Sequence, residues 1–230
     1  MKALRFKLSG RTACFRRAEF NAYAYFTYNN IHKPALLGML GAILGYGGYS
    51  QQKKEEQYPE YYQRLKEIKV SIVPLNSNKG VFSKKIQAFN NSVGYALTNG
   101  SRNLVVREQW LENPCWYIYI LDDGSHEYNK LKEFLLEGKA FYIPYLGKND
   151  HTQITETTIV DMESSESRYI DSIVVGDNVK YGKKIIGKYM VKETVPVKLD
   201  EEYNFAVYEK SFYTNLEYDR DTIDMIYSDG

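Results

Sequence analysis

Hydrophobic and polar positions change period several times along the first 150 residues. An apolar strand is predicted over Lys2–Leu8 and ends at Ser9-Gly10. A helix with few charges follows over Pro34–Leu44, entered by a proline, which is tolerated in a first turn because its missing N–H would be unpaired there. The later pattern predicts a strand over Lys69–Leu75, a strand over Trp116–Leu121, a helix at Glu127–Glu137 and a strand over Ala140–Ile143.

A β-hairpin is predicted between the second and third of these strands. Residues 81–108 alternate apolar and polar in two runs around Asn99-Gly100, which is a strong short-range hairpin signal. The order strand, helix, strand, hairpin, strand, helix, strand predicts an α+β fold. Its core would be ferredoxin-like (RRM-type), with two helices against one antiparallel sheet and the hairpin as an insertion.

The last third of the chain reads as β-rich. Short strands are predicted over Ser172–Val175, Lys188–Val191, Thr194–Leu199 and Asn204–Tyr208, separated by turn residues. These strands could complete the sheet or form a small appendage. We therefore divide the chain into a core over residues 1–150 and a β-rich C-terminal extension over residues 151–230.

The first helix carries three glycines, Gly38, Gly41 and Gly45. Glycine inside a helix costs about 1 kcal/mol relative to alanine. Close approach of the backbone to a sheet or a ligand would offset this cost.

Bulk composition is that of an ordinary globular protein, with 43% hydrophobic and 26% charged residues. Two cysteines, Cys14 and Cys115, do not make a disulfide framework, so a reducing compartment is expected. The least charged run, residues 34–49, is too short to span a bilayer, and its late position does not fit a signal peptide. These features predict a cytoplasmic protein without a membrane partner.

Charge is distributed unevenly around a net value of +1. Residues 1–33 hold seven cations against one acid, and residues 79–107 hold five cations and no acid. Residues 200–230 hold nine acids against two cations. A phosphate backbone responds to local cation density rather than to the molecular sum, so the first two segments are candidates for binding nucleic acid. The alternative is that these are solvated faces whose charges happen to segregate.

Four sequence blocks together resemble the fifth family of CRISPR-associated proteins, most closely its type I-B branch. They are TYNNIHKPALLGMLGAILGYGGY (residues 27–49) after the KLSG strand, RNLVVREQWLENPCWYIYI (102–120), FYIPYLGKNDHTQI (141–154) and Val195-Pro196-Val197. The resemblance implies a non-catalytic Cascade subunit that binds the 5′ handle of crRNA. It also implies a thumb at about residues 79–110, contacts with the backbone subunit and the large subunit, and contact with target DNA only through the complex.

Candidate RNA contacts combine cations with aromatic rings, because single-stranded RNA is held by its phosphates and by stacking of its bases. The loop over residues 11–28 places Arg16 and Arg17 beside several aromatic residues, which include Tyr23 and Tyr25. An equally good interpretation is that these rings simply anchor the loop, and Trp110 is more often a core residue than a stacking platform. The expected RNA-binding residues are Arg11, Arg16, Arg17, Tyr28, Lys33, Lys84, Lys85, Arg102, Arg107, Gln109 and Trp110.

An enzymatic alternative is metal-independent cleavage of precursor crRNA, as in the related type I-C branch. Such cleavage needs a base, an acid and a cation, and Tyr28, His32 and Lys33 form a conceivable set. His126 and His151 read as surface or loop residues. We favour binding without catalysis. A protein-only scaffold would leave the cation-rich segments unused.

Other enzyme classes find no support in the sequence. It has no GxxxxGK[ST] phosphate loop, no HExxH or EF-hand motif and no GxSxG elbow. We therefore expect no metal, no other cofactor and no catalytic residues.

Overall fold

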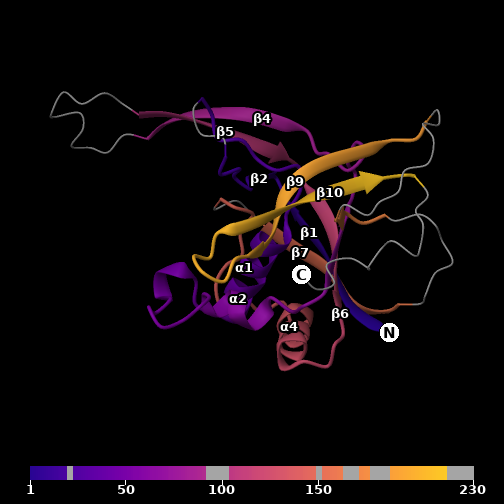
Figure 1. Ribbon diagram of the computed structural model, residues 1–230. Helices are drawn as coiled ribbons and strands as arrows, with labels where there is room; N and C mark the ends of the chain where they lie inside the picture. Colours follow the sequence, from indigo (N-terminus) through magenta and orange to yellow (C-terminus); the bar gives the residue numbers. More distant parts are fainter. Residues whose placement is uncertain (20–22, 92–103, 149–151, 163–170, 177–186, 217–230) are drawn as a thin grey trace.

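The computed structural model describes residues 1–19, 23–91, 104–148, 152–162, 171–176 and 187–216. In this part of the chain the fold is mixed α and β, with three mainly antiparallel sheets and few helices (Figure 1). The elements are β1 (Lys2–Gly10), β2 (Thr12–Ala13), α1 (Lys33–Leu44), the 3-10 turn Tyr49–Gln51, α2 (Glu60–Leu65), β3 (Val70–Pro74), β4 (Lys84–Asn91), β5 (Leu104–Glu112), β6 (Cys115–Leu121), α4 (His126–Leu136), β7 (Thr152–Asp161), β8 (Val174–Val175), β9 (Met190–Leu199) and β10 (Ala206–Thr214).

The largest sheet has the strand order β3-β6-β1-β7 and is antiparallel throughout. Its central strand β1 buries Leu4, Phe6 and Leu8 completely, as the alternation of the sequence requires. The order strand, helix, strand, hairpin, strand, helix, strand is present in the structure, and β7 provides its last member.

The strand predicted over Ala140–Ile143 is wrong. The backbone N–H groups of Phe141 and Tyr142 donate to the carbonyls of Ile43 and Ala42, so this segment closes the C-terminal end of α1 instead of pairing in a sheet. Its apolar side chains are exposed, to 67% for Phe141 and 90% for Ile143. Strand β7 pairs with β1 in its place.

Strands β4 and β5 form the predicted hairpin, and β2 adds to the outer edge of β5. The register pairs Lys84 with Leu111 and Phe89 with Val106. The hairpin extends away from the body of the molecule (Figure 1). Its predicted turn at Asn99-Gly100 lies outside the described residues.

The C-terminal extension both completes the large sheet and forms a small sheet of its own. Strand β7 joins the large sheet, whereas β8, β10 and β9 form a separate sheet. The strands predicted over Lys188–Val191 and Thr194–Leu199 are a single strand, β9. Leu199 is buried in the same hydrophobic cluster as α1, and its N–H donates to the Tyr62 hydroxyl at 2.9 Å. The extension therefore shares a core with the first part of the chain.

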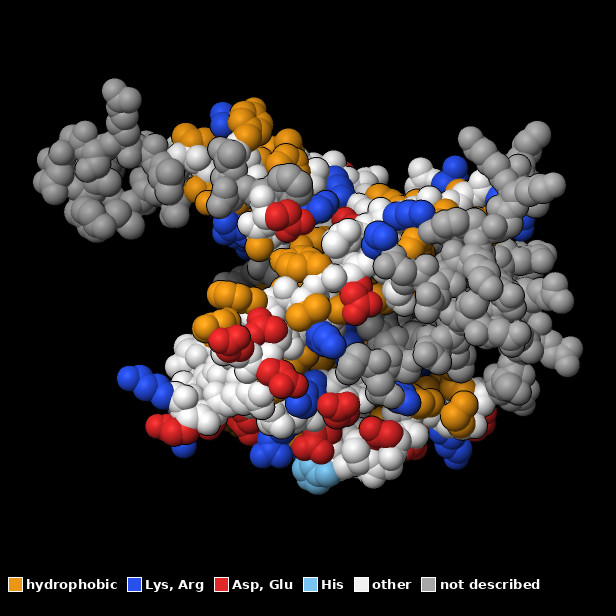
Figure 2. Space-filling view, in the orientation of Figure 1, with side chains coloured by type: hydrophobic (Ala, Val, Ile, Leu, Met, Phe, Trp, Pro, Cys, Tyr) orange, Lys and Arg blue, Asp and Glu red, His pale blue; other side chains and the backbone are white. Residues whose placement is uncertain are grey.

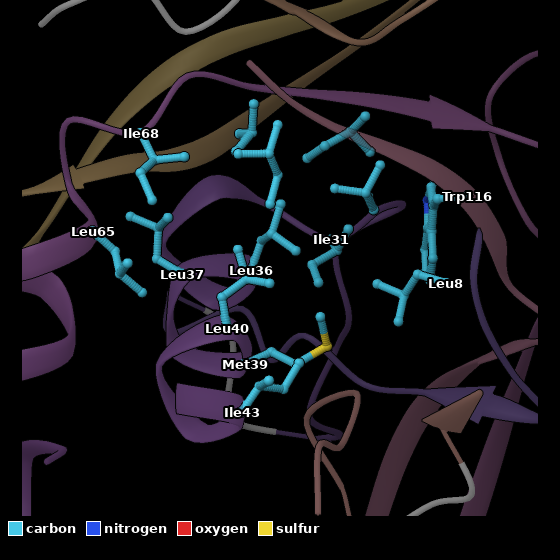
Figure 3. Close-up of a cluster of buried hydrophobic side chains, with 14 of the residues drawn as sticks. Leu8, Ile31, Leu36, Leu37, Met39, Leu40, Ile43, Leu65, Ile68 and Trp116 are labelled. Carbon is cyan, nitrogen blue, oxygen red and sulfur yellow. The ribbon is translucent and has the colours of Figure 1, made fainter. Parts of the chain in front are cut away.

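Helix α1 is the centre of that core. Leu36, Leu40 and Ile43 point into a cluster that runs from Leu65 at the end of α2 to Trp116 on β6 (Figure 3). The Trp116 indole is fully buried and donates to the Asn30 side-chain oxygen at 2.9 Å, so its polar atom is paired. This packing fixes the entry of α1 relative to the sheet.

Of the three glycines, Gly41 is the one that permits a close approach of α1 to helix α2. A Cβ at Gly41 would lie 2.4 Å from the Tyr61 Cβ on α2, whereas a Cβ at Gly38 would be 3.8 Å from the end of the same side chain. Gly45 is the C-cap with φ of +80°, a left-handed conformation that favours glycine. The close contact between α1 and α2 at Gly41 offsets the cost of placing a glycine in the helix.

Candidate nucleic-acid interface

The loop over residues 11–28 docks on the edge of β5, at the base of the hairpin. The Tyr25 N–H donates to the Arg107 carbonyl at 2.9 Å, and the Gln109 N–H donates to the Tyr25 carbonyl at 2.8 Å. The Gln109 side chain accepts from the Thr27 N–H at 3.4 Å. Two segments that are far apart in the sequence are thereby joined into one surface, which we call the loop–hairpin junction (residues 16–19, 23–28 and 105–110).

Two arginine–tyrosine pairs lie at this junction. The Arg16 guanidinium is 3.5 Å from the centre of the Tyr25 ring, and the Arg107 guanidinium is 5.1 Å from the centre of the Tyr23 ring. Both arginines are exposed, and Tyr23 is 70% exposed. Within the described part of the chain neither guanidinium is ion-paired. Planar cations stacked on rings suit a strand of RNA, because they offer N–H groups to phosphates and flat faces to bases.

Arg17, adjacent to Arg16, has a different environment. Its guanidinium lies 2.9 Å from a Glu19 carboxylate oxygen and 3.8 Å from a Glu193 oxygen of β9. It also lies 5.3 Å from the Tyr28 ring, which is only 1% exposed. Arg17 therefore ties the loop to the C-terminal sheet, and Tyr28 is part of the core.

The two lysines at the start of β4 point to different surroundings. The Lys84 ammonium donates to the Asn29 side-chain oxygen at 2.6 Å, and burial lowers the pKa of this lysine. Lys85 is exposed, with its ammonium 4.0 Å from a Glu112 oxygen. As expected for neighbours in a strand, only one of the two is freely presented to solvent. Figure 2 shows blue side chains gathered around the base of the hairpin.

Glu193 is the acidic centre of the internal contacts behind the junction. Its carboxylate accepts from the Asn29 N–H at 2.9 Å and faces both Arg17 and Lys84. Burial raises the pKa of Glu193, and the two cations oppose this rise. Sequence reasoning missed Glu193, because nothing in its local pattern shows that β9 passes next to the N-terminal loop.

Trp110 and its neighbours form a second set that the sequence did not reveal. Glu108 is 6% exposed and accepts from the Trp110 indole at 3.0 Å and from the Lys148 ammonium at 2.8 Å. Lys148 is brought there by the loop around Gly147, where a Cβ would lie 1.8 Å from the Cys14 carbonyl oxygen. The only signal in the sequence is the Gly147-Lys148 dipeptide, which belongs to the resemblance noted above.

The remaining expected contacts are dispersed. Arg11 is exposed beyond the end of β1, and its carbonyl accepts from the Asn113 N–H at 2.9 Å. Lys33 is half-buried at the first residue of α1. Arg102 lies outside the described residues.

Two of the residues considered for catalysis, Tyr28 and His32, are held in structural roles. His32 is the N-cap of α1, and its Nδ1 accepts from the Ala35 N–H at 3.3 Å. Although part of its surface is accessible, desolvation by the surrounding protein lowers the pKa of His32 to about 4. Burial raises the pKa of Tyr28. His126 is exposed at the start of α4, and His151 lies outside the described residues.

The described residues contain no group of three or more His, Cys, Asp or Glu side chains that could hold a metal ion. No helix among them is long and apolar enough to cross a membrane.

A model of the family described as CRISPR-associated protein (Cas_Cas5) matches residues 3–142, more than half of the chain. The chain belongs to the Cas5 family. The match covers the residues from β1 to α4, including the loop–hairpin junction and the described part of the hairpin. The family expected from the four sequence blocks is thereby confirmed.

Solved structures resemble this Cas5 chain over nearly its full length. A chain of a "CRISPR RNA-guided surveillance complex" matches with a TM-score of 0.53 and 12% identity, covering 94% of this chain and 90% of the other. A structure titled "Crystal structure of Cas protein" matches with a TM-score of 0.47 and 10% identity, covering 94% and 95%. The first of these supports a shared fold. No curated protein sequence matches the chain significantly.

Proposed function

We propose that this Cas5 chain is a non-catalytic subunit of a type I CRISPR Cascade effector and that it binds the 5′ handle of crRNA. The observation that carries the proposal is the pair of exposed arginine–tyrosine stacks at the loop–hairpin junction, Arg16 on Tyr25 and Arg107 on Tyr23. They offer two cations and two rings on one surface, which is what a single strand of RNA requires. Likeness to a chain of an RNA-guided complex supports the same assignment.

Within this proposal the cations divide by environment. Arg16, Arg107, Lys85 and Arg11 are exposed and suited to phosphates. Arg17, Lys84 and Gln109 position the loop on the hairpin and on β9, so they act on RNA through the shape of the surface. Lys33, Trp110 and Tyr28 belong to the supporting structure, and Arg102 is a further candidate contact that lies outside the described residues.

The wider architecture of the proposal has two parts. Residues 1–150 would form a ferredoxin-like, RRM-type core with the thumb at about residues 79–110. Residues 151–230 would form a β-rich extension whose strand β7 adds to the core sheet. The strand order β3-β6-β1-β7 supports this, because it places the first and third core strands at the centre of an antiparallel sheet. The subunit would be of type I-B, cap the backbone, contact the large subunit and work in the cytoplasm. It would reach target DNA only through the complex.

The geometry around His32 supports binding without cleavage. A general base must reach the 2′-hydroxyl of the substrate, but the Nδ1 of His32 is occupied as a helix cap and Tyr28 is buried. A hydroxyl with a raised pKa is also a poorer source of a base at neutral pH.

A single titration tests the proposal against the enzymatic alternative. The purified chain is incubated in EDTA with labelled precursor crRNA that contains the repeat, and binding and cleavage are followed over a salt series. We expect salt-sensitive binding to the 5′ handle with intact RNA. Cleavage that is lost in His32→Ala would overturn the non-catalytic assignment, and absence of any binding, alone or with partner subunits, would overturn the RNA-binding assignment.

A further inference from the structure

The turn between β9 and β10 (Asp200–Phe205, the β9–β10 turn) exposes two aromatic rings side by side. Tyr203 is 64% exposed and Phe205 is 70% exposed. Their ring centres are 5.7 Å apart with an interplanar angle of 28°, so they stack on each other in solvent. Paired exposed rings of this size are a feature of interaction surfaces rather than of ordinary loops.

The turn is held in one conformation. A carboxylate oxygen of Asp200 accepts from the N–H groups of Glu202 and Tyr203 at 2.9 and 2.7 Å, and the Asp200 N–H donates to the Phe205 carbonyl at 2.8 Å. Next to the turn, the Leu199 N–H donates to the Tyr62 hydroxyl. The backbone that carries the rings is therefore held in place, which lowers the entropic cost of binding a partner.

The surroundings of the rings are acidic. Three consecutive acidic residues precede the rings in the sequence, namely Asp200, Glu201 and Glu202. Hydrogen bonds from backbone N–H groups keep the pKa of Asp200 below its ordinary value. Lys198 on β9 precedes the turn in the sequence, and the Lys66 ammonium lies 4.7 Å from the centre of the Tyr58 ring. In Figure 2, red side chains border orange ones on the left of the molecule, where Figure 1 draws this turn.

We propose that the β9–β10 turn docks a neighbouring protein subunit through a segment that carries arginine or lysine. A cation placed on the exposed faces of Tyr203 and Phe205 gains a cation–π contact and meets the Glu201 and Glu202 carboxylates at the rim. The same carboxylates repel the phosphates of RNA. The proposal rests on the proposed function in so far as the neighbour is another subunit of the complex, but it concerns a different surface from the RNA contacts.

Assembly of the complex tests this docking surface. The full chain is titrated into its partner subunits bound to crRNA, as wild type, as Tyr203→Ala/Phe205→Ala and as Glu201→Lys/Glu202→Lys. Glu133→Lys on α4 is a single-site control for charge reversal, because this exposed carboxylate lies on another element. Binding of each variant to crRNA alone is measured in parallel, and thermal melting verifies that each is folded.

We expect the aromatic variant to raise the Kd of assembly at least about tenfold, as for a hot-spot residue pair. The charge-reversed variant should associate about tenfold more slowly at low salt, and this difference should vanish at high salt. The aromatic variant should bind crRNA as the wild type does, and the charge-reversed variant should bind it no more weakly. Wild-type assembly by either folded variant would overturn the proposal, as would a loss of crRNA binding by the aromatic variant. A wild-type chain that binds no RNA while these variants still lose assembly would overturn the proposed function alone.

Discussion

Removing two exposed charges at the loop–hairpin junction should weaken RNA binding without unfolding the protein. The perturbation is Arg16→Gln combined with Arg107→Gln, which keeps a polar side chain but removes both stacked guanidinium groups. A charge-assisted hydrogen bond contributes about 1.5–3 kcal/mol, so two such contacts at the lower end correspond to a loss of about 100-fold in affinity. The lost cation–π contacts at exposed sites should lower the free energy of unfolding by only about 1–2 kcal/mol.

The salt dependence gives a sharper number than the affinity. Each phosphate contact with a single strand contributes a slope of about 0.7 in log K against log salt, so losing two contacts lowers the slope by about 1.4. Between 50 and 200 mM salt the wild type should then lose about sevenfold more affinity than the variant, on the same relation. The assay is fluorescence anisotropy of labelled 5′-handle RNA at four or more salt concentrations.

The matched control is Lys53→Gln combined with Lys54→Gln, which removes the same net charge from exposed positions far from the junction in sequence. We expect this control to leave the slope unchanged. An unchanged slope in the arginine variant, or an equal fall in the lysine control, would refute the placement of the RNA at the junction. In the second case, long-range charge alone would explain the binding.

Three further predictions concern the support of the site and the core. Arg17→Met should lower the free energy of unfolding by about 1–3 kcal/mol in urea titrations, because it leaves buried Glu193 with less cationic compensation; wild-type stability would contradict the structural role of this arginine. His32 has a folded pKa of about 4 and an ordinary value of 6.5, so the unfolded chain takes up its proton first as the pH falls. Stability should fall by up to about 3 kcal/mol between pH 6.5 and 4, and His32→Asn, which retains a helix cap, should remove that part of the dependence. Gly41→Ala should destabilise the protein and Gly38→Ala should stabilise it by about 0.5–1 kcal/mol in thermal melts, since only the first added methyl meets α2 closely; equal effects would refute the packing explanation.

Local pattern was enough to predict most elements of the fold. The strand alternation around Leu4 and Leu8, the hairpin strands and the helix entered at Pro34 all have local causes, and they appear within a few residues of their predicted bounds. The strand prediction for Ala140–Ile143 was wrong, because the backbone N–H groups of an apolar run can donate to carbonyls at the end of a helix as well as to a neighbouring strand. Periodicity over four residues cannot distinguish the two outcomes.

The candidate site was predicted less completely, because its internal contacts join distant segments. In the sequence Arg16 and Arg17 are equivalent candidates. In the structure Arg16 lies over the Tyr25 ring, whereas Arg17 is paired with the Glu193 carboxylate of β9. Similarly, Lys148 and Glu108 meet only because the Gly147 loop returns to β5. Sequence composition finds which segments are basic, but the assignment of each charge needs the tertiary structure.

The position of β1 in the large sheet has a consequence for synthesis of the protein. β1 leaves the ribosome before β6 and β7, but it lies between them in the sheet. Until residue 161 has emerged, the edge of β1 that pairs with β7 is unpaired. Unpaired strand edges promote aggregation. This edge of β1 therefore stays unpaired until β7 is made, and shortening the chain before β7 would leave this central strand open on one side.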